Sequence, residues 1–362
     1  MPPLDPELAA RLRRRLLGWY LAGARDLPWR RTTDPYGIWL SEVMLQQTRV
    51  EAVVGYWQRF LDALPTLADL AAAEEERVLG LWSGLGYYRR ARSLHAAAKR
   101  VMEEHDGVLP DDPALLADLP GFGPYTVGAV ASIAFGRRVP AVDGNVARVF
   151  ARLFELELEP SSGPWRRTNH AYAEALLPGP RSAAERGPGA WNQALMELGA
   201  TVCTPRSPRC EACPVAADCR ARAAGRVDEL PLTAKRRAPV DVAVEALLVE
   251  CAAGVLLVER PDSGRNRGLL DPPARERGAP ADLWPSDFAH PELASLWERA
   301  EPRRGFGHAI THHRIRVEVR AIGLDSPSVE RLTASSPYDL VPREDLDGLP
   351  LSGLAKKLLA AS

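Results

Sequence analysis

Four cysteines fall within seventeen residues of this chain, and they constrain its fold more than any other feature. Cys203, Cys210, Cys213 and Cys219 follow the spacing C-x6-C-x2-C-x5-C, and three prolines stiffen the loop between them. Four thiolates this close together can surround one metal centre, and both a zinc ion and a cubane iron–sulfur cluster accept four cysteine ligands. The spacing predicts a metal-binding loop over residues 203–219 and leaves the choice of metal open.

The period of the hydrophobic residues changes once along the chain. The first part has helical spacing and predicts helices at 35–46, 49–63, 74–82, 88–105, 113–118, 124–135, 142–153, 165–177 and 189–200. Beyond a polar, basic stretch the period becomes two, which predicts strands near 240–250, 255–258 and 308–322, with helices near 291–300 and 352–361. The sequence predicts an all-α domain over 1–228, a linker over 229–240 and a smaller α+β domain over 241–362.

The charge of the chain is nearly balanced overall but not locally. Lys and Arg total 46 against 47 Asp and Glu, a net charge of −1, yet residues 86–100 hold five basic side chains and no acidic one. A near-neutral total therefore does not exclude a nucleic-acid partner. The fifth cysteine, Cys251, stands apart and is interpreted as an unpaired thiol, because five cysteines are too few for a disulfide framework.

The N-terminus resembles a signal peptide, because Arg13, Arg14 and Arg15 precede an apolar run. We prefer a helix, because Asp5-Pro6-Glu7 is typical of a helix start. No other segment approaches the ~18 apolar residues of a membrane span. We therefore expect a cytoplasmic protein without a membrane partner.

Glu42 is a candidate general acid. On the predicted helix 35–46, its neighbours at three and four residues' spacing are apolar or neutral, so no surface ion pair explains the carboxylate. An acid on an apolar stripe has a raised pKa, which suits proton donation near neutral pH. A glutamate that reaches solvent from the edge of the helix remains an equal alternative.

Two more segments carry possible function. Gly121 and Gly123 form a tight hairpin before a helix that begins at Pro124, and exposed amides there suit a phosphate group. An ordinary turn between helices is the alternative. Asp143 and Asn145 flank a glycine at a helix start, where Asp143 is either a simple N-cap or a second carboxylate facing Glu42. Taken alone, the cap is the better interpretation.

These features occur in the order typical of one family. The chain resembles the helix-hairpin-helix DNA glycosylases, and among them the MutY-type adenine-DNA glycosylases. The motifs that carry the resemblance are Leu27-Pro28-Trp29, Ser41–Thr48 (SEVMLQQT), Gly84–Arg89 (GLGYYR), Val142–Val146 (VDGNV) and the cysteine loop. The likeness covers nearly all of 25–225.

The resemblance implies a six-helix barrel beside a lobe with a [4Fe-4S] cluster, a monovalent cation at the hairpin, and an active site between the two lobes. Glu42 would protonate adenine, and Asp143 would stabilise the sugar cation by its charge or through a covalent intermediate; Tyr125 and Asn145 would orient this pair. The family's remaining contacts to the flipped adenine, the duplex gap and the opposite base fall on Trp29, Arg30, Leu45, Gln47, Thr48, Leu85, Tyr87 and Gln193. Gly121 and Gly123 would hold the DNA backbone.

Tyr125 separates this chain from endonuclease III-like relatives, which carry a lysine there. A lysine amine forms a Schiff base and cuts the strand, and a phenol cannot. The resemblance thus implies a monomeric, monofunctional glycosylase that acts on adenine opposite 8-oxoguanine or guanine in double-stranded DNA. The alternatives are a glycosylase for oxidised pyrimidines or for T or U opposite G, and a non-catalytic DNA-binding protein that would need no pair of carboxylates.

The C-terminal part resembles, more loosely, the Nudix-like domain that reads 8-oxoguanine in the same family. The family's Phe-Ser-His motif becomes Ile310-Thr311-His312, which keeps the hydroxyl and the imidazole but loses the aromatic ring. Thr311 and His312 are the expected lesion contacts. The paired glutamates of true Nudix hydrolases are missing from the sequence, so we do not expect hydrolysis of nucleoside triphosphates.

Overall fold

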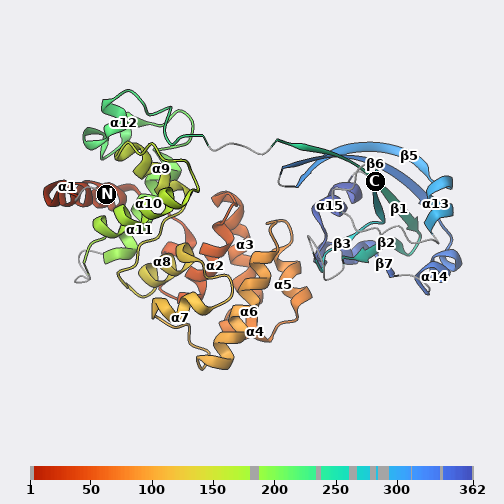
Figure 1. Cartoon of the computed structure of the whole chain (residues 1–362). Helices are drawn as coiled ribbons and strands as arrows, with labels where there is room; N and C mark the ends of the chain where they lie inside the picture. Colours follow the sequence, from red (N-terminus) through yellow and green to blue (C-terminus); the bar gives the residue numbers. More distant parts are fainter. Residues whose placement is uncertain are drawn as a thin grey trace. The chain divides into compact units, whose positions relative to one another are not determined.

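The computed structural model describes residues 4–179, 187–233, 238–260, 267–277, 283, 293–310, 312–334 and 337–360. The chain divides into two compact units (Figure 1). The first consists of Met1–Ala72 and Ser93–Lys235, and the second of Ala73–Arg92 and Arg236–Ser362. No helix in these described ranges is both long enough and apolar enough to span a bilayer.

The first unit is helical. Its elements are α1 (Pro6–Gly23), η1 (Pro28–Arg30), α2 (Pro35–Leu45), α3 (Val50–Ala63), α4 (Leu67–Ala72), most of α6 (Arg89–Glu104), α7 (Pro113–Asp118), α8 (Pro124–Ile133), α9 (Gly144–Leu153), α10 (Gly163–Leu176), α11 (Gly187–Thr201), η3 (Cys210–Ala212), η4 (Ala216–Asp218) and α12 (Arg220–Ala223). Local sequence explains several starts: Asp34, Asp112 and Ser162 accept backbone N–H groups at the first turns of α2, α7 and α10. The short helices α4 and α12 are the ones that the periodicity did not predict.

Apolar faces of α1, α9, α10 and α11 form one core of this unit. Leu12, Phe150 and Trp191 are almost fully buried in it, and the rings of Phe154 and Tyr172 stack 3.9 Å apart. Cys203, Cys213 and Cys219 pack against the same core, and α12 contacts α9 (Figure 1). The cysteine loop is therefore anchored on the helices that also carry Asp143 and Asn145.

Glycines let backbones of the first unit approach closely. A Cβ atom at Gly128 on α8 would lie 2.1 Å from the carbonyl oxygen of Pro140, and one at Gly199 on α11 would lie 2.6 Å from Cβ of Asn145. Neither position accepts a side chain without a shift of backbone. These contacts set the distance of α8 and α11 from the segment 140–145.

In the part of the second unit that the structure describes, the strands form a seven-stranded sheet. Its strands are β1 (Val240–Cys251), β2 (Gly254–Glu259), β3 (Leu270–Asp271), β4 (Ala274–Arg277), β5 (Glu301–Ile310), β6 (His313–Gly323) and β7 (Tyr338–Val341), and its helices are α5 (Glu75–Trp82), α13 (Ala294–Arg299), α14 (Ser326–Ala334), η7 (Arg343–Gly348) and α15 (Gly353–Leu359). The main strand order is β3-β2-β1-β6-β5, with β1 and β6 parallel, β4 paired with β1 and β7 with β2. The period of two in β6 is confirmed: Ile315 and Val317 are buried, whereas Arg314 and Arg316 are exposed.

The prediction of one strand over 308–322 was wrong. The structure has a hairpin in which β5 ends at Ile310 and β6 begins at His313, with these two residues paired. Most side chains of β5 are exposed, so its sequence, rich in Gly, Pro and Arg, shows no alternation. An edge strand of this kind carries no hydrophobic signal.

The division also differs from the expected domain boundaries at residues 73–92, which group with the second unit. A Cβ atom at Gly80 on α5 would lie 2.5 Å from the carbonyl oxygen of Gly348, and the Tyr88 hydroxyl donates a hydrogen bond of 3.1 Å to the carbonyl oxygen of Leu351. These long-range contacts leave no mark in the local sequence pattern.

The close contact at Gly128 leads to a stability prediction. Replacing Gly128 by Ala should destabilise the protein by roughly 2 kcal/mol or more, because the new methyl group overlaps Pro140. Gly55 on α3 is the matched control: it is exposed, nothing lies within 4 Å of its Cβ position, and alanine there should stabilise the helix by up to ~1 kcal/mol. Thermal unfolding followed by circular dichroism measures both, and equal effects would contradict this account.

Candidate active site and metal centre

A cavity of about 610 Å³ lies in the first unit and brings together most of the predicted site residues. Those that line it are Trp29, Arg30, Glu42, Leu45, Gln47, Thr48, Tyr125, Asp143, Asn145 and Gln193. They come from η1, α2 and the turn after it, α8, the start of α9, and α11.

Glu42 lies on α2, whose residues from Tyr36 to Met44 are all buried. Its residue surface is 5% exposed, so the alternative of a glutamate reaching solvent at the helix edge is wrong. The hydroxyl of Tyr125 donates a hydrogen bond of 2.5 Å to Oε2 of Glu42. Burial raises the pKa of Glu42 to about 7, although the bond from Tyr125 opposes the increase. Glu42 can therefore hold a proton near neutral pH.

Asp143 is both an N-cap and a cavity-lining carboxylate, so the two interpretations do not exclude each other. Its Oδ1 accepts a 2.7 Å hydrogen bond from the N–H of Val146, and its Oδ2 accepts one of 2.7 Å from Nδ2 of Asn145. Burial raises the pKa of Asp143, while both hydrogen bonds favour its ionised form. The cap fixes where the carboxylate points.

Tyr125 is the second residue of α8, directly after the glycine hairpin. Gly121 has φ +81°, and a Cβ atom there would lie 2.6 Å from Cβ of Ser93, so the turn requires glycine. Burial and then the charge of Glu42 raise the pKa of Tyr125 well above its usual value, so the phenol keeps its proton. The hairpin thus sets the start of the helix from which Tyr125 reaches Glu42.

Glu197 and Arg25 also line the cavity, and the sequence reasoning missed both. Arg25 Nη2 and Arg30 Nη2 each donate a 2.8 Å hydrogen bond to Oε2 of Glu197. Burial alone would raise the pKa of Glu197, but the two guanidinium groups outweigh it and lower the pKa to about 2. The pattern that identified Glu42 also occurs at Glu197, because its helix contains no basic residue that would explain the carboxylate as part of a surface ion pair.

Arg148 connects the cavity to the cysteine loop. Its Nη2 donates to Oδ1 of Asn145 and to the carbonyl oxygen of Gly199, at 2.7 and 2.8 Å, and its Nε donates to the carbonyl oxygen of Cys203 at 2.8 Å. Asn145 in turn holds Asp143. Through these bonds Arg148 links the position of the Asp143 carboxylate to Cys203 of the metal-binding loop.

The remaining predicted residues lie elsewhere. Leu85 and Tyr87 belong to the second unit and are not on the lining of this cavity. Tyr87 has φ +49° and is 57% exposed, and Nη2 of Arg90 donates to the carbonyl oxygens of Leu85 and Gly86. His312 lies in the β5–β6 turn with its ring 4.1 Å from that of His313. Thr311 lies outside the described residues.

The four cysteines of the loop surround one small cavity together with Arg152 and Arg222. Arg152 is buried, and its Nη1 donates a hydrogen bond of 3.3 Å to Sγ of Cys203. Burial and the charges of the neighbouring thiolates raise the pKa of Cys213 to about 11, against a hydrogen bond from the backbone of Val215. Four thiolates held together at neutral pH need a positive centre between them, so the residues fit a bound metal cluster.

Comparison with known proteins agrees with this geometry. Residues 40–171 match the HhH-GPD superfamily of base excision DNA repair proteins, and residues 203–219 match the iron–sulfur binding domain of endonuclease III. A solved thermostable thymine-DNA glycosylase shares 28% identity and a TM-score of 0.53, over 60% of this chain and 98% of that one. The first unit thus has the helix-hairpin-helix glycosylase fold with an iron–sulfur cluster loop, followed by an α+β sheet unit.

Proteins of similar sequence show which family of glycosylases the chain resembles. The adenine DNA glycosylase of Mycolicibacterium smegmatis is 44% identical over 211 residues, which cover 58% of this chain and 69% of the relative. The human adenine DNA glycosylase is 48% identical over 216 residues, or 57% of this chain and 38% of the relative. The chain belongs to the adenine DNA glycosylase family. It spans less than half the length of the human and rat relatives that it matches.

The metal loop leads to a prediction about cofactor content. Replacing Cys210 by Ser should remove iron and the visible absorption of the cluster, because a ligand is lost. Cys251→Ser is the matched control and should keep both, since this thiol lies in the second unit. Iron analysis and visible absorption spectra of the two purified variants measure these two properties. Full iron content in Cys210→Ser would contradict the assignment.

Proposed function

We propose that this protein is a monofunctional DNA N-glycosylase that removes adenine paired with 8-oxoguanine or guanine in double-stranded DNA. The observation that carries the proposal is the buried Glu42 carboxyl, with a pKa of about 7, across the same cavity from the hydrogen-bonded carboxylate of Asp143. One protonated acid and one ionised acid are what cleavage of an N-glycosidic bond requires.

The first step breaks the bond between the base and the sugar. The carboxylic acid of Glu42 donates its proton to a ring nitrogen of adenine, and the electron pair of the glycosidic bond moves onto the base. The sugar becomes cationic at C1′, where the carboxylate of Asp143 stabilises it by its charge or by a transient bond. The hydrogen bonds from Asn145 and the N–H of Val146 favour the ionised form of Asp143 and hold it in place.

The second step adds water and restores the enzyme. The Glu42 carboxylate, now ionised, accepts a proton from a water molecule whose oxygen bonds to C1′. The products are free adenine and an abasic site, and Glu42 is again protonated. Tyr125 keeps its hydrogen bond to Glu42 and supplies no amine for strand cleavage. When bound, the cluster would cross-link the 203–219 loop, where the carbonyl oxygen of Cys203 accepts a hydrogen bond from Arg148, which also contacts Asn145.

The cavity also supplies contacts for a base that has left the stack. Trp29 gives an aromatic surface, and Gln193 and the Arg25–Glu197–Arg30 group give polar ones. Glu197, held ionised, would accept a hydrogen bond from an exocyclic amine. Adenine carries such an amine and thymine and uracil do not, which favours adenine over these two bases.

The duplex contacts are part of the proposal. Gly121, Gly123 and the N–H groups at the start of α8 would bind a phosphate of the backbone. Gln47 and Tyr87, both with positive φ, would enter the duplex, with Thr48 and Leu85 near the opposite base. Thr311 and His312 would contact 8-oxoguanine. We expect the protein to act as a monomer in the cytoplasm.

The direct test is hydrolysis of a duplex with adenine opposite 8-oxoguanine. The wild-type protein should release adenine, and Glu42→Gln should reduce the single-turnover rate by about 10²–10⁴-fold, because an amide is far too weak an acid to transfer a proton to the base. Duplex binding and iron content should remain unchanged in this variant. Preference for a duplex with an oxidised pyrimidine, or with T or U opposite G, would sink the proposal and favour the rival glycosylases.

Tyr125 gives a second prediction. The wild-type product should be an intact strand with an alkali-sensitive abasic site, and borohydride should trap no protein–DNA adduct. Tyr125→Lys should gain trapping and strand cleavage, because its amine would lie where the phenol contacts Glu42. Tyr125→Phe, which adds no amine, is the control. Trapping of the wild-type protein would refute the monofunctional assignment.

A further inference from the structure

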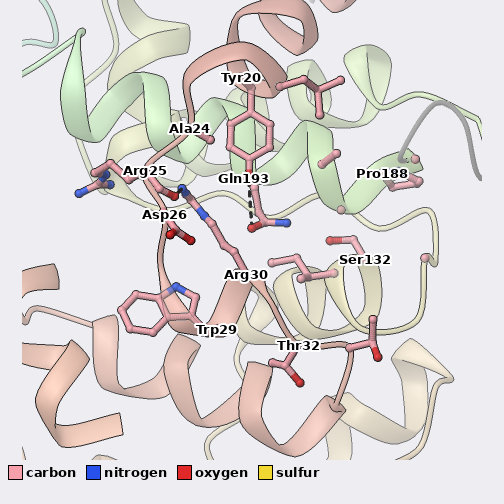
Figure 2. Close-up of a pocket in the computed structure, with 17 residues that line it drawn as sticks. Tyr20, Ala24, Arg25, Asp26, Trp29, Arg30, Thr32, Ser132, Pro188 and Gln193 are labelled. Atoms are coloured by element: carbon pink, nitrogen blue, oxygen red, sulfur yellow. Dashed lines mark hydrogen bonds between the residues drawn. The ribbon is translucent and has the colours of Figure 1, made fainter. Parts of the chain in front are cut away.

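A second cavity, of about 600 Å³, lies in the first unit and contains neither catalytic carboxylate. Figure 2 shows it between the end of α1, the loop that carries Arg25 to Thr32, the end of α8 at Ser132, and the start of α11 at Pro188. Nothing in the proposed reaction uses this space.

The two cavities share part of their walls. Arg25, Trp29, Arg30 and Gln193 line both of them. Side chains of these four residues therefore separate the second cavity from the one that holds Glu42. A passage between the two cavities would therefore require these side chains to move.

Of the four side chains that separate the two cavities, the side chain of Gln193 is the easiest to move. The hydroxyl of Tyr20 donates a hydrogen bond of 3.2 Å to its Oε1, and Figure 2 shows this bond between the two side chains. Arg30 is fixed more firmly: its Nη2 bonds Glu197, its Nη1 bonds the carbonyl oxygen of Arg25, and its guanidinium lies 5.4 Å from the centre of the Tyr20 ring. Rotation of Gln193 breaks one neutral hydrogen bond, whereas rotation of Arg30 breaks an ion pair.

The lining of the second cavity suits a neutral aromatic base rather than an anion. Both guanidinium groups are already paired with Glu197, and Asp26 is paired with Arg31. What remains is the rings of Tyr20 and Trp29, the amide of Gln193, the hydroxyl of Thr33 and the backbone at the start of α11. Flat apolar surfaces with a few donors and acceptors are what a purine binds.

The proposed reaction creates a need for such a space. A nucleotide that enters the catalytic cavity from a duplex fills its opening with the sugar and the phosphates. After the bond breaks, free adenine is enclosed until the DNA leaves or another route opens. We propose that the second cavity receives the free purine after hydrolysis, and that Gln193, held by Tyr20, is the gate between the two cavities. This inference rests on the proposed glycosylase function.

The test measures release of the free base separately from hydrolysis of its glycosidic bond. The substrate carries 2-aminopurine in place of adenine, because this base fluoresces weakly inside protein and DNA and strongly in free solution. Fluorescence measures release, and alkaline cleavage of the abasic strand measures hydrolysis, both in single turnover. Ala24→Trp fills the second cavity, and Gly18→Trp places the same side chain on an exposed face of α1 where nothing lies within 4 Å.

We expect Ala24→Trp to leave hydrolysis within about twofold of wild type and to slow release at least about fivefold, so that fluorescence lags cleavage. Tyr20→Phe frees Gln193 and should speed release, and Gly18→Trp should match wild type. If release keeps pace with cleavage in Ala24→Trp and is unchanged in Tyr20→Phe, this inference is overturned while the glycosylase function stands. Absence of hydrolysis by the wild-type protein on the matched duplex that carries adenine would overturn the glycosylase function itself.

Discussion

The buried carboxyl of Glu42 is the constraint around which the first unit is arranged. Its hydrogen-bond donor is a phenol, not a cation, so burial dominates and the pKa rises to about 7. Such a group costs stability above the ordinary glutamate pKa of about 4.3, where it ionises readily only in the unfolded chain. The cost grows as the pH rises towards the folded-state pKa of about 7 and is constant above it. The fold accepts this cost because an acid that is still protonated near neutral pH can serve as a proton donor.

A second set of contacts keeps the other carboxylate opposite this acid. Asp143 is held by Asn145, Asn145 by Arg148, and Arg148 by the backbone of Gly199 and Cys203. Gly199 lets α11 approach this point, because any side chain there would overlap Asn145. One arginine thus links the helix start that presents Asp143 to the loop that carries the four cysteines.

Much of this arrangement is predictable from the sequence, for identifiable reasons. The proline and the aspartate at 34–35 define the start of α2, and the glycines at 121 and 123 define the turn before α8, because both signals are local. Asp143 could be recognised as a cap and as a carboxylate, but only the structure shows that it is both. Glu197 was missed although its pattern matched that of Glu42, because the arginines that pair with it lie about 170 residues away in sequence.

The parts that could not be predicted depend on long-range contacts or lack a hydrophobic signal. Strand β5 is exposed on most of its length, so no alternation marks it. Residues 73–92 group with the sheet unit through contacts such as that of Tyr88 with Leu351, which no local window contains. The second cavity beside Gln193 likewise arises only where four separate segments meet.

The state of Glu42 is the central claim, and its carboxyl carbon reports that state directly. Carbon-13 NMR of protein labelled at glutamate side chains, with Glu42→Gln to assign the signal, gives the titration midpoint of this one group. The account predicts a midpoint of about 7, which shifts upward in Tyr125→Phe because the hydrogen bond that lowers the pKa is lost. A midpoint near the ordinary glutamate value of about 4.3 would contradict it.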